Sequence, residues 1–231
     1  MSGGGAVRTT GLAAWRDAIR RDRKATAGAV LLGFFVLVGV AGPWLVGDPQ
    51  ALVGIPLQPP SAQHWLGTTG QGQDVLAQLV AGTRVSLAIG FAVGLAVVLV
   101  GALVGVTAGY FGGRVDALLS LLFNVFLVIP GLPLAIVIAA YLPSGPLTLG
   151  LVLTVTGWAW NARVLRAQAL SLRRRDFVAA AIVTGESDFR IVTREILPTM
   201  TSLLVAQVIG STTYAIGAQV GLEFLGLGDV S

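Results

Sequence analysis

The sequence contains no cysteine, a single histidine and a single lysine. Without cysteine the chain can form no disulfide, thiolate metal site or cysteine nucleophile, and the lone His64 excludes a histidine-rich metal or proton-relay site within it. A P-loop needs Gly-Lys followed by Ser or Thr, whereas Lys24 lies between Arg23 and Ala25. We therefore predict no catalytic, cofactor-binding or metal-binding residue, and if the protein uses ATP, another chain binds it.

Charge is also scarce, because only 11% of the 231 residues are charged while 55% are hydrophobic. Soluble domains carry about 25% charged and about 45–50% apolar residues. This composition excludes an ordinary soluble domain and a disordered chain, and it indicates an all-α membrane protein that crosses the bilayer several times.

Five hydrophobic stretches are long enough to cross about 30 Å of hydrocarbon. Residues 1–26 are predicted to form an N-terminal tail with a basic interfacial helix, and residues 47–83 a proline-rich loop. The core is predicted over 84–231, with a polar segment at 166–198. The predicted spans are an N-terminal anchor at 27–46 and core spans at 85–110, 117–142, 146–164 and 199–222.

The positive charges lie almost entirely on one side of these spans. Of the fifteen Lys and Arg residues, fourteen fall before the first span, between the second and third, or around the segment after the fourth. Only Arg84 falls on the other side. Because cytoplasmic loops are enriched in Lys and Arg, the N-terminus and the 166–198 segment are predicted to be cytoplasmic, and nucleic-acid binding is disfavoured.

Small and polar residues inside the spans suggest how the helices pack. The second span contains two runs with Gly-xxx-Gly spacing, which lets helix backbones approach closely. One run is Gly90 and Gly94, and the other is Gly101, Gly105 and Gly109. We favour packing within the bundle over a dimer interface. Gly217 and Gly221 repeat the spacing in the last span, beside small polar residues that suit other helices or a water-filled path.

No ionisable residue lies in the middle of the first four spans, which argues against proton-driven transport. Asn124, Gln207 and Thr213 are candidate residues of a substrate path, although bonding between helices is the simpler interpretation. Pro130 and Pro133 interrupt the third span. They predict a kink, and a gate is the less favoured alternative.

Residues 176–198 predict two short helices joined at a glycine. Asp176 is predicted to cap the first helix, Gly185 to end it in a left-handed conformation, and Pro198 to close the unit. Phe189, Val192 and Ile196 share one predicted face of the second helix. That apolar face needs a partner, either the protein's own bundle or another protein.

This segment resembles the "EAA" coupling loop of ABC-importer permeases. The matching residues are Ala180 and Ala181, then Gly185, then Leu197-Pro198. The resemblance implies that one set of residues contacts an ATPase subunit: Asp176, Phe177, Ala180, Ala181, Gly185, Leu197 and Pro198. Two residues depart from the pattern, since Ala179 replaces the usual Glu and Glu195 stands where Ile is often found.

Further motifs extend the resemblance to the dipeptide, oligopeptide and nickel group of these permeases, specifically to the C-type subunit of peptide systems. Thr69 and Gln73 replace an Asp and an Arg that such permeases often have. The motifs are His64-Trp-Leu-Gly-Thr68, Asp74-Val-Leu76, Gly82-Thr-Arg84, Gly109-Tyr-Phe-Gly-Gly113 with Asp116, and the Phe-Leu-Gly-Leu-Gly of residues 224–228.

The resemblance implies a polytopic bundle of the type I ABC-importer permease kind. Such permeases have six spans, whereas five are recognisable here and the sixth is missing. The expected partners are a second homologous permease, two ABC ATPase subunits that bind ATP and Mg, an extracytoplasmic substrate-binding protein and the lipid bilayer. The expected location is a bacterial plasma (inner) membrane.

The function implied is that of a permease subunit, not an enzyme, which forms half of the pore of an ATP-driven importer for di- or oligopeptides. Nickel, haem or another small solute remain alternative substrates. A channel that works without an ATPase and a non-transporting membrane anchor remain alternative functions.

Overall fold

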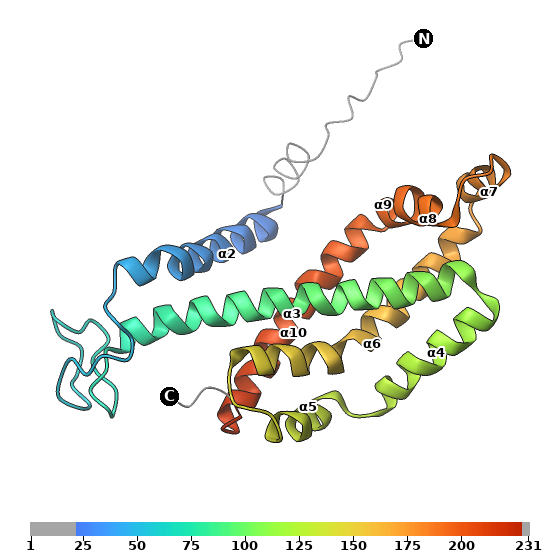
Figure 1. The fold of residues 1–231 in the computed structure, drawn as a ribbon. Coiled ribbons are helices and arrows are strands. Elements are labelled where there is room, and N and C mark those ends of the chain that lie inside the picture. The colour runs from blue at the N-terminus through green and yellow to red at the C-terminus, as the bar shows by residue number, and fades with distance from the viewer. Residues whose placement is uncertain (1–21, 228–231) are drawn as a thin grey trace, which may run out of the picture. The chain divides into compact units, whose positions relative to one another are not determined.

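The computed structural model describes residues 22–227 of the chain, and the elements of regular structure over this range are helices (Figure 1). Strand-like pairing between residues 22 and 227 is limited to two isolated bridges, Leu52 with Gln73 and Thr68 with Asp74. The chain divides into two compact units, one ending at Val85 and the other beginning at Ser86. Most of the predicted basic helix and the last glycine of the C-terminal motif lie outside the described residues.

The first unit begins with helix α2 (Arg23–Ala41) and the 3₁₀ turn η1 (Gly42–Trp44). Asp22 caps α2, because its Oδ1 accepts a 2.8 Å hydrogen bond from the Lys24 amide. The predicted anchor therefore falls on α2 and η1. At the end of this stretch Gly42 lies so close to Val80 that an added Cβ would be 2.5 Å from the Val80 Cγ1.

Irregular backbone links η1 to helix α3 (Val75–Phe111). Thr68 fastens this loop, since its Oγ1 donates to the Ile55 carbonyl at 2.6 Å and accepts from the Gln58 amide at 2.9 Å. Asp74 caps α3 through the amides of Leu76 and Ala77, at 2.8 and 3.1 Å.

Helix α3 begins inside the predicted loop over 47–83 and not at the predicted start of the span at 85–110, and it is continuous over 37 residues. The sequence from Val75 to Phe111 contains no proline and only one charged residue, Arg84. Nothing therefore interrupts the backbone hydrogen bonds of the helix. Its length of about 55 Å exceeds the hydrocarbon thickness, so α3 extends beyond the bilayer.

The second unit combines the remainder of α3 with α4 (Gly113–Val128), α5 (Gly131–Ala140), α6 (Pro146–Arg173) and α10 (Thr201–Phe224). The predicted span at 117–142 is two helices, α4 and α5, bent by 80°. Pro130 stands at the break as the residue before α5. Pro133 is tolerated in the first turn of α5, where an N–H has no partner within the helix.

Three helical stretches among the described residues are long and apolar enough to cross a membrane: Arg23–Trp44, α3 and α10. A fourth qualifies if the bent pair α4–α5 counts as one span. The predicted span at 146–164 lies in α6 but is not among them. Helix α6 also carries Arg163, Arg166 and Arg173, so the polar segment predicted from residue 166 begins inside a helix. The protein is an all-α, multi-pass membrane protein.

Two groups of buried side chains hold the second unit together. One joins α3, α4, α5, α6 and α10 and includes Phe123, Leu149 and Leu222. The other lies where α3 ends and includes Val106, Leu165 and Met200. The short helices of residues 176–198 gather at that same end, beside the turn from α3 to α4 (Figure 1).

Candidate functional site

Glycines of α3 bring three helices of the second unit into close contact. A Cβ added at Gly94 would lie 2.8 Å from the Thr212 amide nitrogen of α10, and one at Gly101 would lie 2.6 Å from the Asn161 Cβ of α6. Gly90 faces α10 in the same way, and Gly105 and Gly109 face α6. The predicted packing role of these two Gly-xxx-Gly runs is confirmed. Gly217 and Gly221 differ, because no described atom lies within 4 Å of a Cβ added at either residue.

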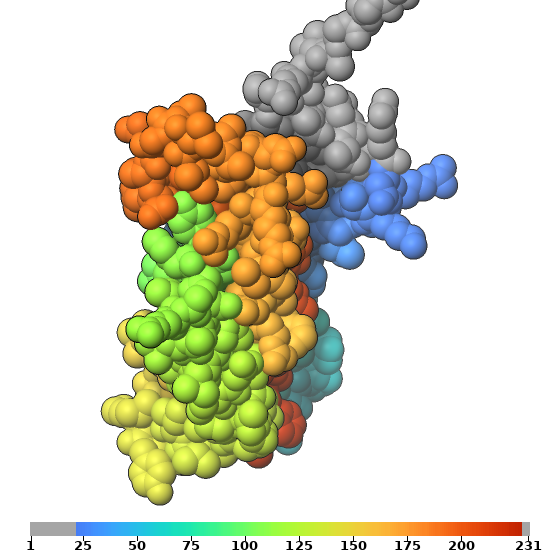
Figure 2. All heavy atoms as spheres, turned by 90° about the vertical axis from the view of Figure 1, so that its right-hand side faces the viewer, coloured from blue at the N-terminus to red at the C-terminus, as the bar shows by residue number. Residues whose placement is uncertain are grey.

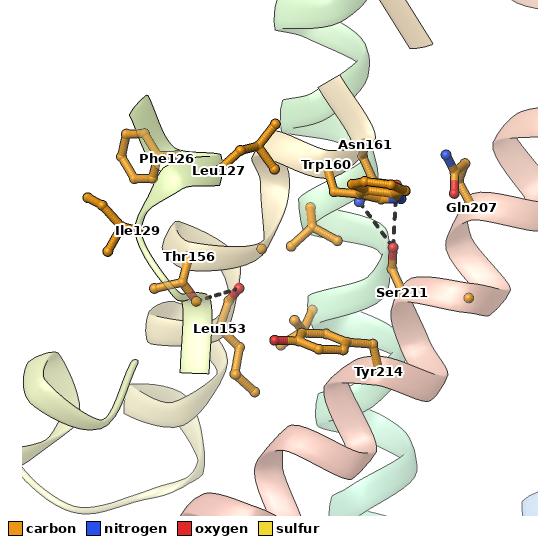
Figure 3. A pocket seen from close by; sticks show the side chains of 15 residues that line it. Phe126, Leu127, Ile129, Leu153, Thr156, Trp160, Asn161, Gln207, Ser211 and Tyr214 are labelled. Atoms are coloured by element: carbon orange, nitrogen blue, oxygen red, sulfur yellow. Dashed lines mark hydrogen bonds between the residues drawn. The ribbon is translucent and has the colours of Figure 1, made fainter. Parts of the chain in front are cut away.

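A pocket of about 470 Å³ opens among all five long helices of this unit. Val93 and Val97 of α3 line it, with Phe126 near the end of α4 and Gly131 at the start of α5. Trp160 of α6 and Tyr214 of α10 contribute aromatic rings on either side (Figure 3). Ile129, beside the Pro130 break, also lines the pocket, so the bend between α4 and α5 shapes its wall.

The polar groups of the pocket are all uncharged. Asn161 Nδ2 donates to Ser211 Oγ at 3.1 Å, which ties α6 to α10 at the pocket wall (Figure 3). Thr156 and Gln207 add a hydroxyl and an amide. Such a lining offers hydrogen bonds and apolar contacts while placing no fixed charge beside a solute, which suits passage more than tight binding of an ion.

The structure brings one of the three predicted path residues into this pocket, namely Gln207. The Asn124 Oδ1 instead accepts a 3.0 Å hydrogen bond from Arg163 Nη2, which links α4 to α6. The Thr213 hydroxyl donates to the Ile209 carbonyl of its own helix at 3.0 Å. Their part in a substrate path stays a prediction that this geometry does not favour.

Sequence reasoning missed Trp160, Asn161 and Tyr214 as pocket residues. Asn161 is only 3% exposed, although it is polar. The run Gly157-Trp-Ala-Trp-Asn161 contains the signal, because a buried Asn beside tryptophans needs a hydrogen-bonding partner on a neighbouring helix.

An ion pair joins α4 and α6 near the turn from α3 to α4. Arg166 holds the Asp116 carboxylate with two nitrogens, its Nε on Oδ1 and its Nη2 on Oδ2, the latter at 2.6 Å. Ser120 also donates to Asp116, at 3.0 Å. A bidentate pair fixes the relative orientation of the two helices more strictly than a single contact does.

Residues 176–198 begin with helix α7 (Asp176–Val183). Its end matches the prediction at Gly185, which has φ of +79°. The Gly185 amide donates to the Ile182 carbonyl at 3.0 Å and the Glu186 amide to the Ala181 carbonyl at 3.1 Å, which is a Schellman motif. The predicted capping by Asp176 is wrong, because Arg175 holds the cap position and Asp176 lies inside the first turn.

The second half of the segment consists of α8 (Asp188–Ile191), the π-helical turn η2 (Val192–Ile196) and α9 (Leu197–Thr199). The predicted face of Phe189, Val192 and Ile196 is wrong at Phe189, which is 79% exposed. Ile191 and Ile196 are the fully buried pair. The wider π turn, in which the Leu197 amide reaches the Val192 carbonyl, changes the register that a regular helix would have.

The segment therefore has a buried inner side and an exposed outer side. Val178, Ile191 and Ile196 pack into the bundle's own core beside Val106 and Tyr110, so Val178 is not offered to a partner. Figure 2 shows α7 and α8 projecting at this end of the second unit. Four large apolar residues are exposed there, and we call them the outer surface: Phe177, Ile182, Val183 and Phe189.

The remaining residues of the predicted coupling set differ in their exposure. Ala180 is exposed and Ala181 is half-buried. Leu197 is half-buried and Pro198 is exposed at the opposite end of the segment. The structure thus places most of the set where another protein can reach it.

In the first unit, His64 and Asp74 form a separate polar pair. His64 Nδ1 donates to Asp74 Oδ2 at 2.8 Å. This hydrogen bond is the main reason why the pKa of Asp74 lies below its ordinary value of 3.8. Partial burial raises the pKa and so opposes the shift, whereas hydrogen bonds from the amides of Ala77 and Leu76 lower it further. The pair fastens the loop to the start of α3.

These features define a multi-pass helical membrane protein with an uncharged internal pocket and an exposed helical segment at one end. The model of the binding-protein-dependent transport system inner membrane component family matches residues 101–231. The chain belongs to this family, whose members are membrane permease components, and it is a transport subunit, not a catalytic one.

Curated relatives agree with the family over nearly the whole chain. The dipeptide transport system permease protein DppC of Bacillus subtilis is 35% identical over 219 residues, which are 93% of this chain and 68% of the relative. The oligopeptide transport system permease protein OppC of Mycobacterium tuberculosis is 36% identical, covering 90% of this chain and 73% of the relative. The OppC protein of Bacillus subtilis is 30% identical, with 94% and 73% coverage.

Proposed function

We propose that this protein is one permease subunit of an ATP-driven importer of di- or oligopeptides and forms half of its translocation pore. The relatives are named as dipeptide and oligopeptide transport permeases. The uncharged pocket supports the same substrate class, because a path for peptides of varied sequence must not select for one side-chain charge.

The observation that carries the proposal is the segment at residues 176–198. It exposes Phe177, Ile182, Val183 and Phe189 although it lies beside polar backbone turns and arginines. Exposed apolar side chains gathered on one short element are typical of a docking site. The segment continues directly from α6 and leads into α10, so a partner that moves it would move two walls of the pocket.

The partners proposed for this arrangement are two ATPase subunits, a second homologous permease and an extracytoplasmic binding protein. The ATPase subunits bind ATP and Mg, and one of them contacts the outer surface of the 176–198 segment. The excess of Lys and Arg near this segment and before α2 supports a cytoplasmic N-terminus for a protein of the bacterial plasma membrane.

Transport follows from two arrangements of the pocket, open to one side of the membrane or to the other. Closure of the ATPase pair displaces the 176–198 segment, and α6 and α10 change the access of the pocket. No residue of this chain performs covalent chemistry, and its contribution is to hold, orient and release the peptide.

The test is purification of the protein from its native host in mild detergent, with identification of the co-purifying chains and assay of ATP hydrolysis. The proposal expects two ATPases and a second permease, with hydrolysis stimulated by peptide and a binding protein in proteoliposomes. A protein that conducts solute without an ATPase would indicate a channel, and one with no transport would indicate an anchor. Uptake of nickel or haem but not of peptides would contradict the substrate class.

A further inference from the structure

We propose that Tyr110 is a positioning residue that fastens the start of α8 to α3, so that movement of the 176–198 segment is passed along α3 to the pocket. This inference rests on the proposed function, because it concerns how ATP hydrolysis in a partner reaches the pore. It assigns a role to the tyrosine of the Gly109-Tyr-Phe-Gly-Gly113 motif.

The contact joins two parts of the chain that are 78 residues apart. The Tyr110 hydroxyl donates to the Asp188 Oδ1 at 2.7 Å. Tyr110 is only 4% exposed, and its ring belongs to the buried group that includes Val178 and Ile191 of the segment. A hydrogen bond to a carboxylate is stronger than one between neutral groups, and partial burial strengthens it further.

A second contact also holds the turn after α3. Arg173, the last residue of α6, donates from Nη1 to the Phe111 carbonyl at 3.2 Å. Gly112 has φ of +67°, and a Cβ added there would lie 2.5 Å from that Nη1. The end of α3 and the turn after it are therefore bonded both to the end of α6 and to the start of α8.

The hydrogen bond adds a directional contact to the apolar packing of Ile191, which also holds α8 against the bundle. Gly185 separates α8 from α7, and the π turn η2 separates it from α10. Phe189, an exposed residue of the outer surface, directly follows Asp188. A partner that binds Phe189 and moves it therefore acts one residue away from Asp188, which accepts the hydrogen bond from Tyr110.

Helix α3 is suited to carry this movement to the pocket. It runs unbroken from Tyr110 back to Val97, which lines the pocket about 20 Å away along the helix axis. Without the Tyr110 contact, α8 can pivot about η2 and leave α3 in place. ATP would then be hydrolysed with less movement of the pore.

The experiment compares variants of the complete complex, with its ATPases, second permease and binding protein, in proteoliposomes supplied with labelled trialanine. Tyr110→Phe removes only the hydroxyl, and Tyr141→Phe removes the same atom from an 87% exposed tyrosine elsewhere. Asp188→Asn keeps an acceptor oxygen, whereas Asp188→Ala does not. The readout is the number of ATP molecules hydrolysed per peptide imported, with the thermal midpoint of the complex measured in parallel.

We expect Tyr110→Phe and Asp188→Ala to raise this ratio roughly tenfold, the factor expected for losing a hydrogen bond to a charged group. The double variant should show no further increase, Asp188→Asn should give a smaller increase because it keeps a neutral acceptor, and Tyr141→Phe should stay near the wild type. A lower thermal midpoint with an unchanged ratio would overturn the inference and leave a merely structural contact. A wild-type complex that imports no peptide would overturn the proposed function and this inference with it.

Discussion

Gly185 shows how a single residue sets the geometry of the 176–198 segment. Its φ of +79° belongs to the left-handed region, where a side chain is strained. Its surroundings are open, since no described atom lies within 4 Å of an added Cβ. Any effect of a substitution at residue 185 therefore comes from backbone conformation and not from a clash.

Gly185→Val should weaken the turn by about 1–2 kcal/mol, the cost of a left-handed conformation for a residue with a Cβ, and Val adds a branched side chain. We expect α7 and α8 to lose their fixed relative orientation, so that a complex with this variant hydrolyses ATP but imports little peptide. Peptide uptake and ATP hydrolysis measured together would reveal this. Gly185→Asn is the matched control, because Asn tolerates the left-handed region. Wild-type coupling in Gly185→Val would contradict the role of this turn.

Asp74 has two tasks at the start of α3, since it caps the helix and binds His64. Because its pKa is lowered in the folded protein, its contribution to stability is complete above the pKa of an unfolded Asp, about 3.9. The contribution is lost as the pH falls through the lower, folded pKa.

We predict that the thermal midpoint of the purified protein falls as the pH is lowered from about 5 to about 2 and that Asp74→Asn reduces this fall. The asparagine keeps a capping oxygen but loses the charge that His64 stabilises. Asp48→Asn serves as the control, because among residues 22–227 the Asp48 carboxylate accepts only from the nearby Gln50 amide. An unchanged pH dependence in Asp74→Asn would contradict the role of the pair.

At the level of elements, α3 organises the second unit through its glycines. Helix α10 packs closely against Gly90 and Gly94, and α6 packs closely against Gly101, Gly105 and Gly109. Side chains at these positions would push the helices apart and open the pocket that they enclose. Tight helix contacts through small residues are common in membranes, where apolar side chains gain little from leaving lipid.

Gly101→Ala should destabilise the protein by about 1–3 kcal/mol, because its Cβ would overlap Asn161 and the backbone of α6. Gly82→Ala in the same helix is the control. No described atom lies within 4 Å of its added Cβ, and Ala favours helix by up to about 1 kcal/mol. Thermal unfolding in detergent measures both variants. Equal midpoints would show that α6 shifts to accept the methyl group.

The break between α4 and α5 is the element that departs most from a simple span. Pro130 allows an 80° bend, and Ile129 and Gly131 on either side of it line the pocket. A straight span over 117–142 would place α5 along α4 and remove this wall. The prolines predicted an interruption, but its angle depends on how α5 packs against α6.

At the level of the whole molecule, the proposed docking surface is separate from the pocket proposed for the solute. The outer surface of the 176–198 segment is at one end of the second unit, and the pocket lies among its helices. The continuous helices α3, α6 and α10 connect the two. This separation is what a transport subunit needs if its energy is released in another chain.

Val183→Asp tests the docking surface directly. Val183 is 87% exposed, so a charge there should leave the fold intact. We expect the variant to lose most of its co-purifying ATPase, because a docked carboxylate would be buried without a partner. Val183→Thr keeps the shape and should retain the ATPase. Unchanged recovery of the ATPase with Val183→Asp would show that docking uses another surface.

The sequence by itself determined the helical membrane fold, since its composition leaves no soluble alternative. It also determined the left-handed turn at Gly185 and the packing role of the α3 glycines, because both depend on residues that lack a Cβ. It did not predict the continuous α3, since the polar residues around Arg84 suggested a boundary that an uninterrupted helix does not need.

Only the tertiary structure decided which polar residues meet. Asn124 and Gln207 looked equivalent in the sequence, but Arg163 binds Asn124 whereas Gln207 lines the pocket. Phe189, predicted on the apolar face, is exposed, and Ile191 is buried with Ile196 across the π turn that follows it. The Tyr110–Asp188 contact joins residues 78 apart. Such pairs depend on how whole helices pack, and local periodicity carries no information about the partner across the bundle.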